Sequence, residues 1–376
     1  MAAVTPPGRY DLYNGNRLKL GLFGSNCSSG RAATTVPERW SGGWEENLAV
    51  AQLADEAGID FMLPIGRWRG YGGATNFEGA SLETITWATG LLAQTKRMSI
   101  FGTVHAPMYH PIVAAKQFVT ADLVGRGRFG LNLVCGWNQD EFTMFGVQQR
   151  EHDLRYAYGT DWISIVMKLW TQSEPFDLQS AYFDVRGVVG EPKPYGGVRP
   201  MVMNAGASPV GREFGITNCD LLFIPLSDVN VGAQDVAAAE ARGRELGKRI
   251  RVCANGFIVC RPTQREAEEY LQYYSQDHAD WEAVDHLMTL NGFYSRSHSP
   301  EHFVQYRNRW AAGHGGYPVV GDPDTVAREL IRIAEAGFFG FCFSFVNYLE
   351  ELPYFRDEVL PRLVAAGIRV DIEEQA

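Results

Sequence analysis

The chain has 376 residues, 45% of them hydrophobic, and a formal charge of −10. This length is enough for one large α/β domain or for two ordinary domains. The acidic balance argues against nucleic acid and against an anionic membrane surface as partners, because both require an excess of Lys and Arg. No apolar run approaches the ~20 residues of a membrane span.

The six cysteines are scattered singly through the chain, and no Cys or His spacing is typical of a metal site. We therefore expect no metal. Scattered cysteines in a chain of this size favour a reducing compartment, the cytoplasm. The N-terminus, which starts Met1-Ala-Ala-Val4, lacks the basic segment and the apolar core of a signal peptide.

Eight short apolar runs alternate with segments of helical periodicity along the whole chain. The expected strands cover residues 18–23, 59–64, 99–103, 129–134, 200–204, 221–225, 250–260 and 339–345. The main expected helices cover residues 45–57, 81–95, 159–171, 210–217, 231–246, 264–280, 323–336 and 350–366. Such alternation indicates parallel βαβ units, and eight of them predict an α/β fold, a single (β/α)8 TIM barrel over residues 1–376.

Two insertions are expected in this barrel. Residues 182–189 look like a small hairpin outside the main repeat. A longer insertion covers about residues 264–321, and its part from 281 to 320 is a possible lid over the site, since long insertions on the catalytic face often have that role.

A doubly wound open sheet is the competing architecture. Gly125-Arg-Gly-Arg-Phe-Gly130 matches the dinucleotide-binding pattern G-x-G-x-x-G. That motif must leave a strand and open a helix, whereas this match follows a helix and enters a strand. We interpret the match as chance.

The stretch Phe129-Gly-Leu-Asn-Leu-Val134 has the length of a buried strand, and Asn132 interrupts its apolar character. A buried amide costs a few kcal/mol unless it is hydrogen-bonded. Gly136 and Trp137 follow with a turn and a large flat side chain. A polar residue near the end of a barrel strand is typical of a catalytic position. A core strand whose Asn bonds to backbone is an equally good interpretation.

The turn Asn204-Ala-Gly-Ala-Ser208 follows the fifth strand, and Pro209 fits the first position of a helix. Amides at a helix N-terminus and a Ser hydroxyl form an anion site. An ordinary N-cap Ser is the alternative, and one turn can serve both purposes. Arg155 and Tyr156 offer a guanidinium and a hydroxyl to phosphate, although such a pair is more often a solvated helix start.

Thr103 ends the third strand, where β-branched residues are common, and His105 follows it in a loop. His105 is a possible proton carrier, but a single loop histidine is more often part of the surface. No nucleophile elbow and no metalloprotease motif is present. A barrel with a phosphate site and no nucleophile suggests that a bound cofactor supplies the chemistry.

Several stretches together resemble a known family. They are Asp60-Phe-Met-Leu63, Arg69-Gly-Tyr-Gly-Gly73, Ala114-Ala-Lys-Gln117, Gly127-Arg-Phe-Gly-Leu-Asn-Leu-Val-Cys-Gly-Trp137, Glu151-His-Asp-Leu-Arg-Tyr156, Ala205-Gly-Ala-Ser208 and Tyr354-Phe-Arg-Asp-Glu-Val-Leu-Pro361. In this order they resemble the bacterial luciferase-like flavin monooxygenases, in particular the pyrimidine oxygenase and dimethylsulfone monooxygenase branch.

The resemblance implies reduced FMN (FMNH2) at the C-terminal ends of the strands, O2 as co-substrate, and a separate NAD(P)H:flavin reductase as the source of FMNH2. It places Gly66 and Arg67 beside the isoalloxazine, and Asn132 and Glu141 in hydrogen bonds to the ring. It assigns the ribityl phosphate to four residues, which are Arg155, Tyr156, Gly206 and Ser208. It also makes Thr103 and Asn132 the catalytic pair, with oxygen carried as a flavin peroxide or at flavin N5.

The substrate implied is a small organic molecule such as a heterocycle, a sulfone or a halogenated ring, and Trp40, His105 and Trp137 are its candidate contacts. A deazaflavin (F420)-dependent oxidoreductase on the same barrel is one alternative, although no basic run near Ser208 fits its acidic tail. A non-catalytic flavin-binding protein is another. The resemblance further implies a homodimer or homotetramer.

Overall fold

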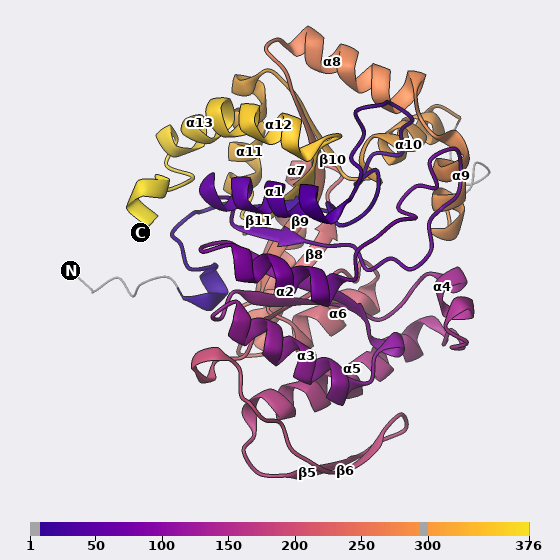
Figure 1. The fold of residues 1–376 in the computed structure, drawn as a ribbon, viewed down its shortest axis with the longest axis vertical. Helices are drawn as coiled ribbons and strands as arrows, with labels where there is room; N and C mark the ends of the chain where they lie inside the picture. The colour runs from indigo at the N-terminus through magenta and orange to yellow at the C-terminus, as the bar shows by residue number, and fades with distance from the viewer. Residues whose placement is uncertain (1–7, 294–299, 376) are drawn as a thin grey trace.

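A computed structural model of the chain describes residues 8–293 and 300–375. Residues 1–7, on which the expectation about a signal peptide depends, and residues 294–299, which belong to the proposed lid, lie outside this described part. Figure 1 shows the two termini on one side of the molecule, with the long insertion and α4 on the opposite side.

Eight parallel strands close into a barrel, which confirms the predicted (β/α)8 fold. In spatial order each strand pairs with the next, and β9 pairs with both β8 and β11 to close the ring. The barrel strands are β1 (Lys19–Phe23), β2 (Phe61–Leu63), β3 (Ser99–His105), β4 (Phe129–Val134), β7 (Met201–Asn204), β8 (Leu221–Pro225), β9 (Arg251–Cys260) and β11 (Gly340–Ser344).

Helices surround the barrel and carry the connections between its strands. Their bounds are α1 (Trp44–Glu56), α2 (Thr84–Gln94), α3 (Pro111–Val124), α4 (Gln139–Met144), α5 (His152–Thr171), α6 (Pro209–Asn218), α7 (Val229–Glu245), α11 (Pro323–Glu335), α12 (Tyr348–Tyr354) and α13 (Leu360–Ala365). The Gly125–Gly130 match lies in the turn between α3 and β4, at the opposite end from the strand C-termini, so it has no role in binding a dinucleotide there.

The alternation of side chains along the strands decides which residues reach the inside of the barrel. Phe101 packs in the inner apolar cluster with Phe61 and Met203. Thr103 and His105 follow Phe101 at two-residue intervals, so they point to the same side, nearer the C-terminal end. Thr103 pairs in register with Asn132 of β4, which pairs with Met203 of β7. Thr103, Asn132 and, two residues further along β3, His105 thus place polar side chains above this apolar cluster.

The insertion after β9 contains α8 (Gln264–Gln272), α9 (Trp281–Leu290), α10 (Pro300–Gly313) and the strand β10 (Tyr317–Gly321). β10 pairs with the last residues of β9, beyond the barrel, and was not predicted from the sequence. The insertion is tied to the loop after β1, since Ala33 N donates to Ala311 O at 2.9 Å and Thr35 N donates to His278 O at 2.7 Å. Its motion as a lid stays a prediction.

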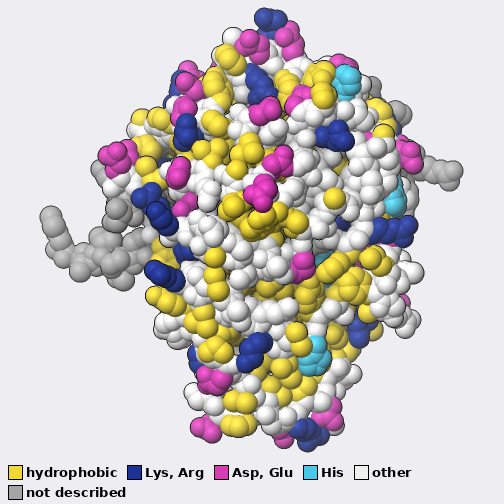
Figure 2. Space-filling model, in the orientation of Figure 1, with side chains coloured by type: hydrophobic (Ala, Val, Ile, Leu, Met, Phe, Trp, Pro, Cys, Tyr) yellow, Lys and Arg dark blue, Asp and Glu magenta, His cyan; other side chains and the backbone are white. Residues whose placement is uncertain are grey.

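The small hairpin is confirmed in kind but not in its bounds. It pairs β5 (Phe176–Gln179) with β6 (Asp184–Val188), so its first strand precedes the predicted one. It lies apart from the barrel in Figure 1. Figure 2 shows acidic and basic side chains interspersed on the face displayed, without a large field of one sign. Within residues 8–293 and 300–375, no helix is long and apolar enough to cross a membrane.

A buried ion pair fastens the N-terminal end of the barrel. The Asp60 carboxylate accepts hydrogen bonds from Arg369 Nη1 at 2.6 Å and from the Leu20 amide at 2.7 Å. Asn14 and Asn16 each donate to its other oxygen at 2.7 Å. Burial alone would raise the pKa of Asp60, but Arg369, Lys19 and these bonds lower it below its usual value. One carboxylate therefore joins both ends of the chain to the first strand.

We expect Asp60→Asn to lower the free energy of unfolding by about 3–5 kcal/mol at pH 7, because Arg369 would be left buried without its counter-charge. Because folding lowers the pKa of Asp60, this contribution is fully present above the ordinary carboxyl pKa of about 4 and is lost as the pH falls through the lowered pKa of the folded protein, so the difference between the two proteins should begin to shrink at pH 3.5. Urea unfolding at pH 7 and pH 3.5 measures both. Asp324→Asn, which removes a pair on the surface with Arg362, is the control and should change stability little. Equal effects of the two substitutions would contradict this account.

Candidate active site

Two adjoining cavities open at the C-terminal end of the barrel. The barrel-mouth cavity has a volume of about 500 Å³ and reaches from Phe23 and Arg31 past Asn132 to Arg155 and Ala205–Ala207. The side cavity, of about 460 Å³, lies between the loop before α1, the loop after β2 and the start of α2. Gly66, Arg67, Thr103 and His105 line both cavities.

Thr103 and Asn132 form a buried neutral pair in the wall of the barrel-mouth cavity. Asn132 Nδ2 donates to Thr103 Oγ1 at 3.2 Å, and the Thr103 hydroxyl donates to Pro64 O at 2.6 Å. Asn132 Oδ1 is buried and has no protein partner among the described residues. The Thr103 hydrogen is thus engaged by the backbone, while Asn132 retains one N–H and an unpaired oxygen for a ligand.

The far end of the barrel-mouth cavity has the geometry of an anion site. Ser208 is the N-cap of α6, which starts at Pro209, and its Oγ accepts from Gly211 N at 3.1 Å. This confirms the predicted helix start. Tyr156 lies against this turn, because a Cβ on Gly211 would be only 2.5 Å from the Tyr156 hydroxyl oxygen. Arg155 Nη1 donates to Gly136 O at 2.7 Å, and its buried Nε has no partner within the described part of the chain.

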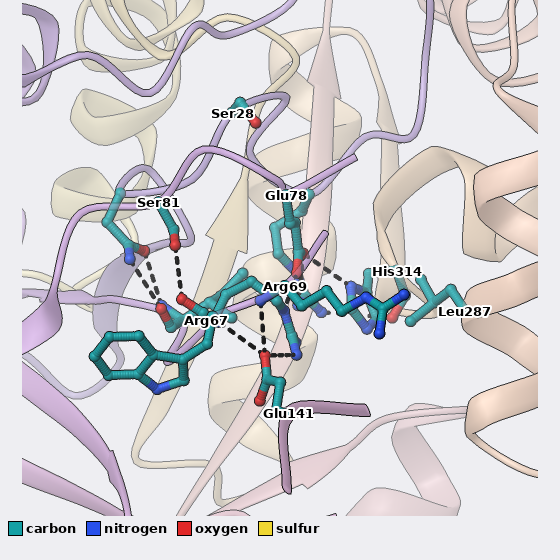
Figure 3. A network of polar contacts seen from close by, with 12 residues as sticks. Ser28, Arg67, Arg69, Glu78, Ser81, Glu141, Leu287 and His314 are labelled. Carbon is teal, nitrogen blue, oxygen red and sulfur yellow. Dashed lines mark hydrogen bonds and ion pairs between the residues drawn. The ribbon is translucent and has the colours of Figure 1, made fainter. Parts of the chain in front are cut away.

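A network of buried charges stands at the boundary of the two cavities (Figure 3). Arg67 lies between two carboxylates, with Nε 3.0 Å from Glu78 Oε2 and Nη1 2.9 Å from Glu141 Oε1. Glu78 also accepts from His314 Nδ1 at 3.1 Å and lies 4.0 Å from Arg31 Nη1. Buried charges are tolerated only when they are paired in this way.

The network fixes the charge state of its members. Burial alone would raise the pKa of Glu78, but His314, Arg67 and Arg31 hold it well below its usual value. Burial and Arg31 lower the pKa of His314 to about 4. At neutral pH His314 is therefore an uncharged donor to an ionised Glu78, and the two carboxylates balance Arg31 and Arg67.

Glu141 is not in the wall of either cavity, but its Oε2 is buried and has no partner among the described residues, so its predicted hydrogen bond to a flavin ring stays a prediction. It is fully buried behind the loop after β2, where Oε1 accepts from Arg67 and from the amides of Trp68 at 2.8 Å and Arg69 at 3.4 Å. Glu141 is a positioning residue for this loop.

Trp40 is a correction to the predicted site. It is 1% exposed, donates to Ser25 O and packs on Tyr348 with ring centroids 5.0 Å apart, so it belongs to the core and not to a substrate pocket. Ser208 itself is not part of the cavity wall, although the three residues before it are. Trp137 and His105 do line the barrel-mouth cavity, as do Gly66, Arg67, Arg155, Tyr156 and Gly206.

Sequence reasoning missed Arg31, Glu78 and His314. The unusual length of the loop after β1 was a signal for Arg31, since long loops in compact domains are often functional. Glu78 and His314 come from a Gly-rich loop and from the insertion, which only the tertiary fold brings together.

We expect Glu141→Ala to loosen the loop after β2, because the buried Arg67 and two backbone amides would lose their acceptor. Amide exchange at Trp68 and Arg69 should accelerate, and the free energy of unfolding should fall by about 3–5 kcal/mol. Asp140→Ala is the matched neighbour, since the Asp140 carboxylate makes two long, partly exposed contacts, at 3.7 Å with Arg69 and at 3.8 Å with His286. Unchanged exchange at both amides in Glu141→Ala would refute the positioning role.

Comparison with known proteins identifies the family of the chain. Residues 19–339 match the family model of luciferase-like monooxygenases. An FMNH(2)-dependent dimethylsulfone monooxygenase from Pseudomonas fluorescens is 26% identical over 356 residues, which cover 92% of this chain and 94% of that protein. The pyrimidine monooxygenase RutA from Cronobacter turicensis is 28% identical over 356 residues, which cover 92% of each protein.

The solved structure of DmoA from Hyphomicrobium sulfonivorans has the same fold, with a TM-score of 0.85 at 20% identity over 95% of this chain and 90% of that one. The resemblance inferred from the sequence is confirmed. The match to the family model covers most of the chain. It begins with β1 and ends one residue before β11, so it includes the other seven barrel strands. The chain belongs to the luciferase-like monooxygenase family.

Proposed function

We propose that the protein is an FMNH2-dependent monooxygenase that uses O2 on a small organic substrate, with reduced flavin supplied by a separate NAD(P)H:flavin reductase. Its relatives include an FMNH(2)-dependent dimethylsulfone monooxygenase and a pyrimidine monooxygenase. The observation that carries the proposal is the barrel-mouth cavity, which joins an anion site at one end to the buried Thr103–Asn132 pair at the other.

The residues present fit FMN. The unpaired Arg155 Nε, the Tyr156 hydroxyl and the turn Ala205–Ala207 suit a phosphate, since a guanidinium and helix N-terminal amides both favour an anion. Asn132, with one free N–H and an unpaired Oδ1, suits the mixed donors and acceptors on the edge of a flavin ring. Bound FMNH2 would supply the electrons that activate O2.

The Asn132 amide would stabilise the negative charge that develops on oxygen during the reaction. A preorganised neutral donor in a site without bulk water stabilises negative charge that develops on oxygen, and it does so without reorganisation during the step. Thr103 orients Asn132, because its hydroxyl oxygen accepts from the amide while its hydrogen is held by Pro64 O. In this proposal Thr103 fixes the direction of the amide and Asn132 makes the contact.

Charge balance supports FMN over a deazaflavin with an acidic tail. Three arginines line the barrel-mouth cavity, and Arg31 and Arg67 are already matched by Glu78 and Glu141. Only Arg155 has spare capacity for an anion. One phosphate needs no more than that, whereas a chain of carboxylates does.

We predict that Asn132→Ala slows the reaction of protein-bound FMNH2 with O2 by about 100-fold to 1,000-fold, the range for the loss of one preorganised donor. FMN affinity should change little, because the phosphate contacts remain. Stopped-flow oxidation of the FMNH2 complex and fluorescence titration with FMN measure the two quantities. Full reaction with O2 in this variant would eliminate the assigned role.

We also predict that Arg155→Met weakens FMN binding by about tenfold to a hundredfold while it leaves riboflavin binding unchanged, because only FMN carries the phosphate. Arg150→Met is the control, since Arg150 stacks on Tyr158 at 4.3 Å and does not line the cavity. Parallel losses for FMN and riboflavin in Arg155→Met would rule out the phosphate contact.

A further inference from the structure

The side cavity is lined by a different set of residues from the barrel-mouth cavity, apart from the four that they share. Its wall includes Ser41, Trp68, Leu82, Glu83 and Tyr109. Its volume of about 460 Å³ falls within the range of about 300–1,000 Å³ that is typical of small-molecule sites. It is separate from the anion site, which lies in the barrel-mouth cavity.

His105 offers a hydrogen-bond acceptor in the wall shared by the two cavities. The ring is 3% exposed, and burial lowers its pKa to about 4, so it is neutral at pH 7. A neutral imidazole has one donor nitrogen and one acceptor nitrogen. The Gly66 backbone accepts a hydrogen bond from the ring, whereas Nδ1 is buried and has no partner among the described residues. An unpaired buried acceptor is costly until a ligand satisfies it.

The charges around the side cavity are already compensated. Arg67 is paired with two carboxylates. Glu83 accepts from the amides of Ile85 at 3.1 Å and Thr86 at 2.8 Å and from the Tyr109 hydroxyl at 3.2 Å. An anionic ligand would lose its water without gaining a free positive charge, which is unfavourable in a partly buried site.

We propose that the side cavity binds the organic substrate, that this substrate carries no negative charge, and that Nδ1 of His105 accepts a hydrogen bond from an N–H or O–H group on it. That the ligand is a substrate rests on the proposed monooxygenase function, whereas the kind of ligand that binds is inferred from the residues of the cavity alone. The assignment places the substrate beside the Thr103–Asn132 pair, because Thr103 lies in the wall of both cavities.

Gly66 keeps the shared wall thin. A Cβ at this position would lie 3.3 Å from the His105 ring and 3.3 Å from Thr103 Cγ2. A side chain at this position would therefore crowd both His105 and Thr103.

Two isomeric probes test the proposal on the wild-type protein. Both 5,6-dimethyluracil and 1,3-dimethyluracil are neutral and have the same atoms, but only the first retains its N–H donors. We expect 5,6-dimethyluracil to bind about tenfold more tightly, the effect of one satisfied hydrogen bond, and the anion orotate to bind more weakly than either. Calorimetric titration of the FMN-loaded protein measures the three affinities.

His105→Leu removes the acceptor and keeps a bulky buried side chain, so the preference between the isomers should disappear. Tyr109→Phe is the matched wall control, because it removes a hydroxyl from the same cavity without touching His105, and the preference should persist. Far-UV circular dichroism and thermal unfolding verify the fold of each variant.

Equal affinity of the wild type for the two isomers, binding of neither, or tighter binding of orotate would overturn the proposal. A preference that survives in His105→Leu would overturn the role of His105. Titration of each protein with FMN keeps the two proposals apart. Loss of FMN binding with the isomer preference intact would count against the monooxygenase function and not against the side cavity.

Discussion

The structure of the active site depends on one buried cation held between two carboxylates. Arg67 pairs with Glu78 and Glu141, and each of these acids bonds to a further segment of the chain. Glu78 bonds to His314 from the insertion, and Glu141 holds the amides after β2. Breaking such a network costs several kcal/mol, since the remaining charges stay buried. The loop after β2, the helix after β4 and the insertion are thereby fixed around the mouth of the barrel.

Because of this constraint, the charged side chains lie apart from the neutral Thr103–Asn132 pair. The ionised side chains satisfy one another at the boundary of the two cavities, so the position that we propose as reactive is left to neutral groups. Thr103 and Asn132 occupy the top of the barrel interior without any carboxylate in contact. A neutral donor there suits charge that develops only during the reaction, because a fixed charge would stabilise the resting state as well. Arg155, at the other end of the cavity, keeps a guanidinium nitrogen free for an anion.

The sequence predicted the barrel well, because strands that are buried on both faces appear as short apolar runs at regular spacing. It also placed Asn132 near the end of a strand and started α6 at Pro209, but it ended the third strand at Thr103 and put His105 in a loop, whereas β3 continues to a buried His105. It missed β10, in which Pro318 follows a Gly-rich stretch and the strand lies outside the barrel. Trp40 was assigned to the substrate although it is buried in the core. A motif shows which residues are close in the sequence. The direction of a side chain depends also on tertiary contacts, such as the hydrogen bond between Glu78 and His314, two residues that are 236 positions apart.

The most direct measurement of the central claim is rapid mixing of the anaerobic complex of the protein and FMNH2 with O2, followed by absorbance. The account predicts a transient spectrum distinct from those of reduced and oxidised FMN, because the dry neutral site at Asn132 would hold oxygen against the flavin before oxidised FMN appears. Oxidation at the rate of free FMNH2, with no transient, would contradict it.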